Sequence, residues 1–236
     1  MVHTPSSPRL AVLIDADNTS HQIADGLFDE IAQLGEASVR RIYGDFSSTH
    51  LKGWAQLLAK HAITPQQQFA YTTGKNASDI TMVIDAMDLL HGARVDGFCL
   101  VSSDSDFTRL ASRIREQGLD VYGFGESKTP ESLRQACKRF IFTENLMGSA
   151  TSVSKAKDAV TLLRKAIDQI GGDDGWAQLS AVGTLLSKQA SDFDPRSYGH
   201  RKLSDLVAAT GAFETRKDGL TLSVRAKLPL AKASKS

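Results

Sequence analysis

Short apolar runs alternate with amphipathic segments from residue 10 to residue 146, and no other feature of the sequence constrains the fold as strongly. Two of the runs, LAVLID (10–15) and GFCLVSS (97–103), have the unbroken apolar character of buried strands. Weaker strand patterns lie near residues 39–43, 67–71, 120–125 and 139–144. Helical spacing occupies the intervening segments, at 23–34, 51–61, 78–91, 106–117 and from Pro130 onward. Strands that alternate with helices of about ten residues or more predict βαβ units, and therefore an α/β domain with a mostly parallel sheet flanked by helices.

The pattern changes after residue 146, where a small, polar segment begins. Three helical patterns follow, near residues 160–170, 178–190 and 198–209. Two strand-like segments then flank Lys217-Asp218-Gly219, and Asp-Gly is a strong hairpin signal. Three helices and a terminal hairpin predict a small winged helix-turn-helix domain. We therefore expect four segments: the α/β domain at 9–146, a linker at 147–154, the winged helix at 155–227 and a disordered tail at 228–236.

Two pairs of carboxylates follow the two clearest strands. Asp15 and Asp17 close the first strand, in LIDADN, and Asp104 and Asp106 follow the fourth, in VSSDSDF. Because ligand sites in parallel sheets lie outside the carboxyl ends of the strands, we expect these acids to meet at one edge. Crowded carboxylates repel one another unless a hard cation such as Mg²⁺ or Mn²⁺ binds them. A metal at this edge would activate water and neutralise charge on a phosphate.

The helical segment 78–91 supplies a further acid. At ~100° per residue, Asp79 lies about 120° from Asp85 and about 180° from Asp88, so the three cannot serve one metal. We expect Asp79, at the helix start, to be the ligand, and Asp85 to be an indirect or structural partner. Lys75, in the preceding loop, is a candidate for contacting a nucleic-acid phosphate.

Other roles remain open for some of these residues. Asp106 precedes a helical pattern and would serve equally as an N-cap, and Asp17 as a cap or turn residue. A structural role is harder to give to Asp15, because burying an unpaired charge beside a core strand is costly. We expect Asn18 to orient a carboxylate or a phosphate through its amide.

The charge divides unevenly along the chain, although the net charge is only +1. Residues 1–150 hold 14 Lys and Arg against 18 Asp and Glu, whereas residues 151–236 hold 14 against 9. An acidic pocket joined to a basic module fits a protein that approaches phosphates. The basic residues expected to contact RNA here are His200, Arg201 and Lys202, at the start of the third helix, and Arg216 and Lys217, at the hairpin tip. The same surface would alternatively bind a protein partner.

Several protein classes are excluded. No apolar run approaches the ~18 residues that a membrane span needs. The first residues do not resemble a secretory signal, so we expect a cytoplasmic protein. Cys99 and Cys137, without a C-x-x-C partner, predict neither a zinc site nor a disulfide framework. Oligomeric state cannot be inferred from the sequence.

The segments LIDADN, GKNASDITMVIDAMD and VSSDSDF, in that order, resemble the NYN domain, a branch of the PIN-like nucleases, over about residues 9–146. The resemblance implies a PIN-like Rossmannoid sheet and a ribonuclease that depends on Mg²⁺ or Mn²⁺. By motif, Asp15 and Asn18 match the first-strand site, Asp79 the helix acid, and Asp104 and Asp106 the fourth-strand pair. The family often has Gly after its first Asp, where this chain has Ala16.

The C-terminal part carries a second resemblance. The segments DGWAQLS, FDPRSYGHRKLSDL and AFETR are similar to the OST-HTH (LOTUS) domain over about residues 155–227. This resemblance implies a winged helix that binds RNA. The whole chain then corresponds to a nuclease joined to a module that recognises RNA or a protein partner.

Two other functions fit parts of the sequence. LIDADNT matches the D-x-D-x-T opening of haloacid dehalogenase-type phosphatases, in which Asp15 would attack phosphorus and Asp17 would be the acid/base. A non-catalytic RNA-binding adaptor would instead hold a structural ion among the acids. Dinucleotide binding is disfavoured, because no G-x-G-x-x-G follows LAVLID.

Overall fold

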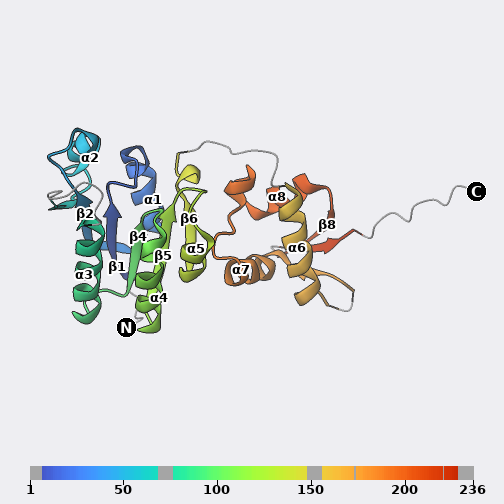
Figure 1. The fold of residues 1–236 in the computed structure, drawn as a ribbon. Coiled ribbons are helices and arrows are strands. Elements are labelled where there is room, and N and C mark those ends of the chain that lie inside the picture. Colours follow the sequence, from blue (N-terminus) through green and yellow to red (C-terminus); the bar gives the residue numbers. More distant parts are fainter. Residues whose placement is uncertain (1–6, 69–76, 148–155, 173, 220, 228–236) are drawn as a thin grey trace, which may run out of the picture. The chain divides into compact units, whose positions relative to one another are not determined.

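The computed structural model describes residues 7–68, 77–147, 156–172, 174–219 and 221–227. The chain divides into two compact units, Met1–Ser149 and Ala150–Ser236, each with its own hydrophobic core (Figure 1). Among the helices in these ranges, none combines the length and apolar character that crossing a membrane requires.

The first unit is a six-stranded sheet in which every neighbouring pair of strands is parallel. Its strands are β1 (Arg9–Asp15), β2 (Glu36–Gly44), β3 (Thr64–Gln67), β4 (Gly97–Val101), β5 (Asp120–Gly125) and β6 (Arg139–Phe142). They lie in the order β3-β2-β1-β4-β5-β6. The order therefore reverses between β1 and β4, and ligands of open α/β sheets bind at such a switch point.

Helices cover both faces of this sheet. They are α1 (Ala24–Leu34), α2 (Lys52–Leu57), α3 (Ala77–His91), α4 (Thr108–Glu116) and α5 (Glu131–Ala136). Alternate residues of β1 face opposite cores: Leu13 packs with α3, α4 and α5, whereas Val12 packs with α1 and α2. Because both faces are buried, β1 and β4 are continuously apolar, which explains their clear sequence signal.

The second unit contains three helices and a small antiparallel sheet. The helices are α6 (Ala156–Ile170), α7 (Leu179–Gln189) and α8 (Leu203–Thr210), and the strands are β7 (Ala177–Gln178), β8 (Phe213–Asp218) and β9 (Thr221–Ala226). The sheet has the order β7-β9-β8, and β8 and β9 form the predicted hairpin. The predicted fold class, a parallel α/β domain followed by a small helical domain with a terminal hairpin, is confirmed.

Two elements differ from their predicted positions. The third strand was expected at 67–71, of which 69–71 lie outside the described residues; the strand that the structure describes is β3 at Thr64–Gln67, a polar edge strand that pairs with β2. The pattern at 198–209 is not one helix: a 3-10 turn, η6 (Pro195–Tyr198), ends at Gly199, whose φ of 83° is left-handed, and α8 begins only at Leu203.

Candidate active site

Asp15 lies at the carboxyl end of β1 and is only 1% exposed. Its Oδ2 accepts hydrogen bonds from Ser102 Oγ at 2.7 Å and Asn18 Nδ2 at 2.8 Å, and its Oδ1 accepts one from the Asn18 backbone N–H at 3.3 Å. Burial raises the pKa of the Asp15 carboxyl above its ordinary value, although these hydrogen bonds oppose the shift. Asn18 therefore orients a carboxylate, one of the two roles expected for it.

Ser102 was not singled out by the sequence, although it lies inside the motif VSSDSDF. It is 2% exposed and follows β4, which neighbours β1 in the sheet. Besides donating to Asp15, its Oγ accepts the backbone N–H of Asp104 at 3.0 Å. One buried hydroxyl thus joins the two strand ends across the switch point.

Asp104 and Asp106 lie in the turn after β4. Asp104 is the N-cap of the 3-10 turn η3 (Ser105–Phe107), and its Oδ1 accepts the Asp106 backbone N–H at 2.9 Å. The capping role that the sequence left open for Asp106 therefore belongs to Asp104. Asp106 is exposed in the first turn of η3.

Asp79 lies in the first turn of α3, which packs against β1 and β2 through Met82 and Ala86. Its pKa is raised to about 6. Burial is the largest cause, and the others are the charges of four carboxylates, those of Asp15, Asp104, Asp106 and Asp17. The fold therefore brings acids from three separate segments together at the carboxyl edge of the sheet.

The neighbouring acids have different partners. Asp17 is exposed, and its Oδ2 accepts a hydrogen bond from Ser78 Oγ at 3.2 Å, which links the loop after β1 to the start of α3. Asp85 accepts hydrogen bonds from Arg41 Nη1 and Tyr43 Oη, both at 2.6 Å. Asp85 is thus a structural partner within the sheet–helix layer.

The oxygen-rich cluster suits a hard divalent cation. In the described part of the chain, no three His, Cys, Asp or Glu side chains converge closely enough to enclose a metal ion by themselves. Mg²⁺ does not need such a cage, because it usually keeps several waters and takes one or two carboxylates plus a substrate phosphate. Burial is the largest cause of the raised pKa of Asp79, and the charges of four neighbouring carboxylates add to it, so a bound cation would relieve part of the shift. The donor set therefore fits Mg²⁺ or Mn²⁺.

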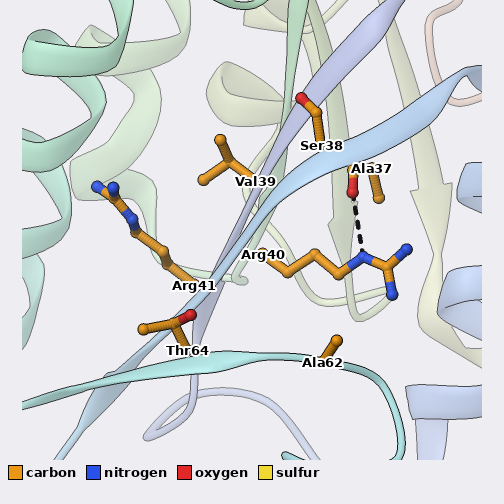
Figure 2. Close-up of a pocket in the computed structure, with 7 residues that line it drawn as sticks. All are labelled: Ala37, Ser38, Val39, Arg40, Arg41, Ala62 and Thr64. Atoms are coloured by element: carbon orange, nitrogen blue, oxygen red, sulfur yellow. Dashed lines mark hydrogen bonds between the residues drawn. The ribbon is translucent and has the colours of Figure 1, made fainter.

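A separate hollow lies along β2, away from these acids, and is lined by Ala37, Ser38, Val39, Arg40, Arg41, Ala62 and Thr64 (Figure 2). β3 pairs with β2 from Arg41 onward, and within the described part of the chain no strand pairs with the preceding residues of β2 on that side. Arg40 covers this edge: its Nε donates to the Ala37 carbonyl at 3.1 Å and its Nη1 to the His61 carbonyl at 2.7 Å. The hollow is therefore a protected sheet edge.

The basic residues of the second unit are differently placed from the prediction. His200, Arg201 and Lys202 do not open a helix but form the turn before α8, whose N-cap is Lys202. Arg201 and Lys202 are exposed, and His200 is half-buried. Lys75 lies outside the described residues.

Arg216 and Lys217 lie on β8 rather than in the connecting turn, and they face opposite sides of the small sheet. Lys217 pairs with Leu222, on the face that carries the buried Val224. Arg216 lies on the outer face, where its Cζ is 4.6 Å from the ring centre of Trp176. Arg225 is 4.8 Å from the same ring. Trp176 thus packs on this outer face and is half-buried.

The fold and the acidic edge define a nuclease-type α/β domain of the PIN-like class. The chain belongs to the NYN domain family, whose family model matches residues 9–146. The OST-HTH/LOTUS domain model matches residues 154–223, and this domain is associated with RNA binding.

The chain is similar to solved structures. A protein of unknown function from Vibrio parahaemolyticus is 18% identical, with a TM-score of 0.50, over 60% of this chain and 96% of that one. An uncharacterized protein from Nitrosomonas europaea is 34% identical, with a TM-score of 0.31, over 37% of this chain and 86% of that one. The first likeness supports the fold alone. No curated protein matches.

Proposed function

We propose that this chain is a divalent-metal-dependent ribonuclease that acts in the cytoplasm and hydrolyses phosphodiester bonds at the carboxyl edge of its parallel sheet. The observation that carries the proposal is the position of Asp15, Asp79 and Asp104 at the carboxyl edge of the sheet beside the β1–β4 switch point, where burial, and after it the charges of the neighbouring carboxylates, raises the pKa of Asp79 to about 6. Membership of a nuclease-like family and an RNA-associated second domain support it.

In this proposal each residue has a distinct task. Asp15, Asp79 and Asp104 hold Mg²⁺ or Mn²⁺, and Asp106 completes the site or orients the attacking water. Asn18 and Ser102 are positioning residues, because they hydrogen-bond the Asp15 carboxylate and fix its orientation. The bound metal would activate water and neutralise charge on the scissile phosphate.

The phosphatase alternative has less support. An aspartyl nucleophile must present a free oxygen to phosphorus. Asp15 is 1% exposed, and both of its carboxylate oxygens accept hydrogen bonds. The hydrogen bonds from Asn18 and Ser102 hold this carboxylate in one orientation, as outer partners commonly do for a metal-ligating carboxylate.

For the second unit, we propose that residues 155–227 bind RNA through Arg201, Lys202 and Lys217, with His200 beside them. Exposed Lys and Arg contact phosphates without strong sequence preference. Lys75, which precedes α3 in the sequence, and Arg216 complete the proposed set of basic contacts. We propose 9–146 and 155–227 as the domain limits, joined by a linker at 147–154.

The test is cleavage of end-labelled single-stranded and structured RNA with Mg²⁺, with Mn²⁺ or with chelator. Asp79→Asn is compared with Asp88→Asn, because Asp88 is exposed on the same helix and is not among the charges that act on Asp79. We expect metal-dependent products from the wild type and Asp88→Asn, and none from Asp79→Asn. Tight RNA binding without cleavage under either metal would favour the RNA-binding adaptor.

A further inference from the structure

A polar hollow with a volume of about 540 Å³ adjoins the acids on the α2 side of the sheet. Residues from the segments 16–21, 48–54 and 126–128, which follow β1, β2 and β5, line it. Asp17 and Asn18 belong both to this lining and to the loop that leaves Asp15. The hollow therefore lies directly beside the acidic cluster.

One wall of the hollow is the imidazole of His21, which is held in place. A Cβ atom on Gly53 would lie 2.4 Å from His21 Nδ1, 2.5 Å from Cγ and 2.6 Å from Cε1. Since the three distances are nearly equal, the ring rests with its face against Gly53, and any side chain there would displace it. His21 is exposed and lines the hollow, so its opposite face is open.

The loop that carries His21 is anchored to α2. Trp54, 2% exposed, donates its Nε1–H to the Thr19 carbonyl at 2.8 Å. Ser20 caps the following turn by accepting the Gln22 backbone N–H at 3.3 Å. The His21 ring is thus preorganised before any ligand arrives, which lowers the entropic cost of binding.

Charge at the rim is mixed. Lys128 pairs with Glu126 at 2.8 Å, and both side chains are largely exposed. An exposed pair of this kind contributes little by itself, so Lys128 can exchange its partner for a phosphate. Asp17 and Glu126 repel anions, which leaves the Lys128 side as the approach for phosphate.

We propose that this hollow is a nucleotide-binding subsite for single-stranded RNA, with a base stacked on His21 and its phosphate near Lys128. A preorganised imidazole face suits an unpaired base, and a lysine suits the backbone. This proposal rests on the proposed ribonuclease function in one respect, since the bound nucleotide is placed next to the phosphodiester that the acids would hydrolyse. Binding of the nucleotide to the subsite is measured separately from cleavage.

The test uses the full chain carrying Asp15→Asn, to prevent cleavage, and a fluorescent single-stranded RNA tetranucleotide. His21→Ala is compared with His91→Ala, since His91 is exposed at the far end of α3 from Asp79. Lys128→Ala is compared with Lys138→Ala, since Lys138 also forms an exposed pair, with Asp120, but just before β6 begins. We expect about a tenfold loss of affinity for His21→Ala and a smaller loss for Lys128→Ala. Both controls should bind normally.

Two further variants distinguish the loss of base stacking on His21 from disruption of the folded structure. His21→Phe keeps an aromatic face and should retain most of the affinity, whereas Gly53→Ala should displace the ring and lose it. Photo-crosslinking of a 4-thiouridine tetranucleotide should label the segments 16–21 or 48–54. Adducts confined to residues 156–227, or equal affinities for His21→Ala and His91→Ala, would overturn the subsite. Absence of RNA cleavage by the wild-type chain would contradict the ribonuclease without affecting these binding results.

Discussion

At the scale of single residues, the carboxylates of the acidic cluster repel one another in the folded chain. Asp79 titrates near 6 because it is partly buried and faces four other carboxylates. A raised carboxyl pKa means that the folded chain binds this proton more tightly than the unfolded chain. The metal-free protein should therefore lose stability as the pH rises from about 4, the unfolded value, through 6, and regain none of it above that range.

This reasoning predicts the behaviour of Asp79→Asn in chelator. The variant should show a higher Tm than the wild type at pH 7 and a flatter Tm between pH 4 and 6, because the repelled charge is gone. Thermal unfolding followed by circular dichroism across this pH range measures both. Added Mg²⁺ or Mn²⁺ should raise the Tm of the wild type more than that of Asp79→Asn. A lower Tm for the variant at pH 7 would mean that Asp79 is a stabilising partner and not a repelled ligand.

A second prediction concerns Ser102. Ser102→Ala removes the 2.7 Å donor to a buried carboxylate and the acceptor for the Asp104 N–H. Leaving buried polar groups unpaired should cost about 1–3 kcal/mol of unfolding free energy. It should also lower cleavage, because Asp15 loses its fixed orientation. Urea unfolding and the RNA assay measure the two effects, with the exposed Ser105→Ala as control. An unchanged cleavage rate would remove Ser102 from the positioning residues.

At the scale of elements, the strands with the clearest apolar sequence patterns are those that are buried on both faces. β1 and β4 were predicted well because both of their faces are covered, whereas β3 (TPQQ) carries no apolar pattern for a sequence method to detect. The site depended on the same logic: parallel strand ends predicted that Asp15 and Asp104 would share an edge. Ser102 was not predicted because a single serine next to Asp residues forms no motif or periodic pattern.

The opposed faces of β8 separate two basic neighbours. Arg216→Ala should lower the stability of the second unit, by about 0.5–1 kcal/mol for a lost exposed cation–π contact, with a smaller effect on RNA affinity. Lys217→Ala should leave stability unchanged and reduce the salt dependence of RNA binding by about one phosphate contact. Thermal unfolding and binding at several salt concentrations separate the two. Equal losses of affinity would show that both residues reach the RNA.

At the scale of the whole molecule, the acids of the candidate active site and the exposed basic turn lie in different units. The acids lie in Met1–Ser149, and the exposed basic turn before α8 lies in Ala150–Ser236. A chain that ends at Ser149 should bind Mn²⁺ as the full chain does, yet bind RNA more weakly and with a smaller salt slope. Calorimetry with the metal and filter binding with RNA measure these. RNA affinity equal to that of the full chain would instead assign the second unit to a protein partner.

The strand order also bears on when during synthesis the proposed active site can assemble. Asp15 and Ser102, which share a hydrogen bond, are 87 residues apart in the sequence, and β4, which pairs with β1, is synthesised after β2 and β3. Closing so long a loop is slow and must precede the contacts that reward it. A nascent chain that has not yet released β4 and the turn after it from the ribosome holds Asp15 but no assembled site. The proposed nuclease would therefore be inactive while the nascent chain is still close to the RNA of the ribosome, until most of its first unit has been made.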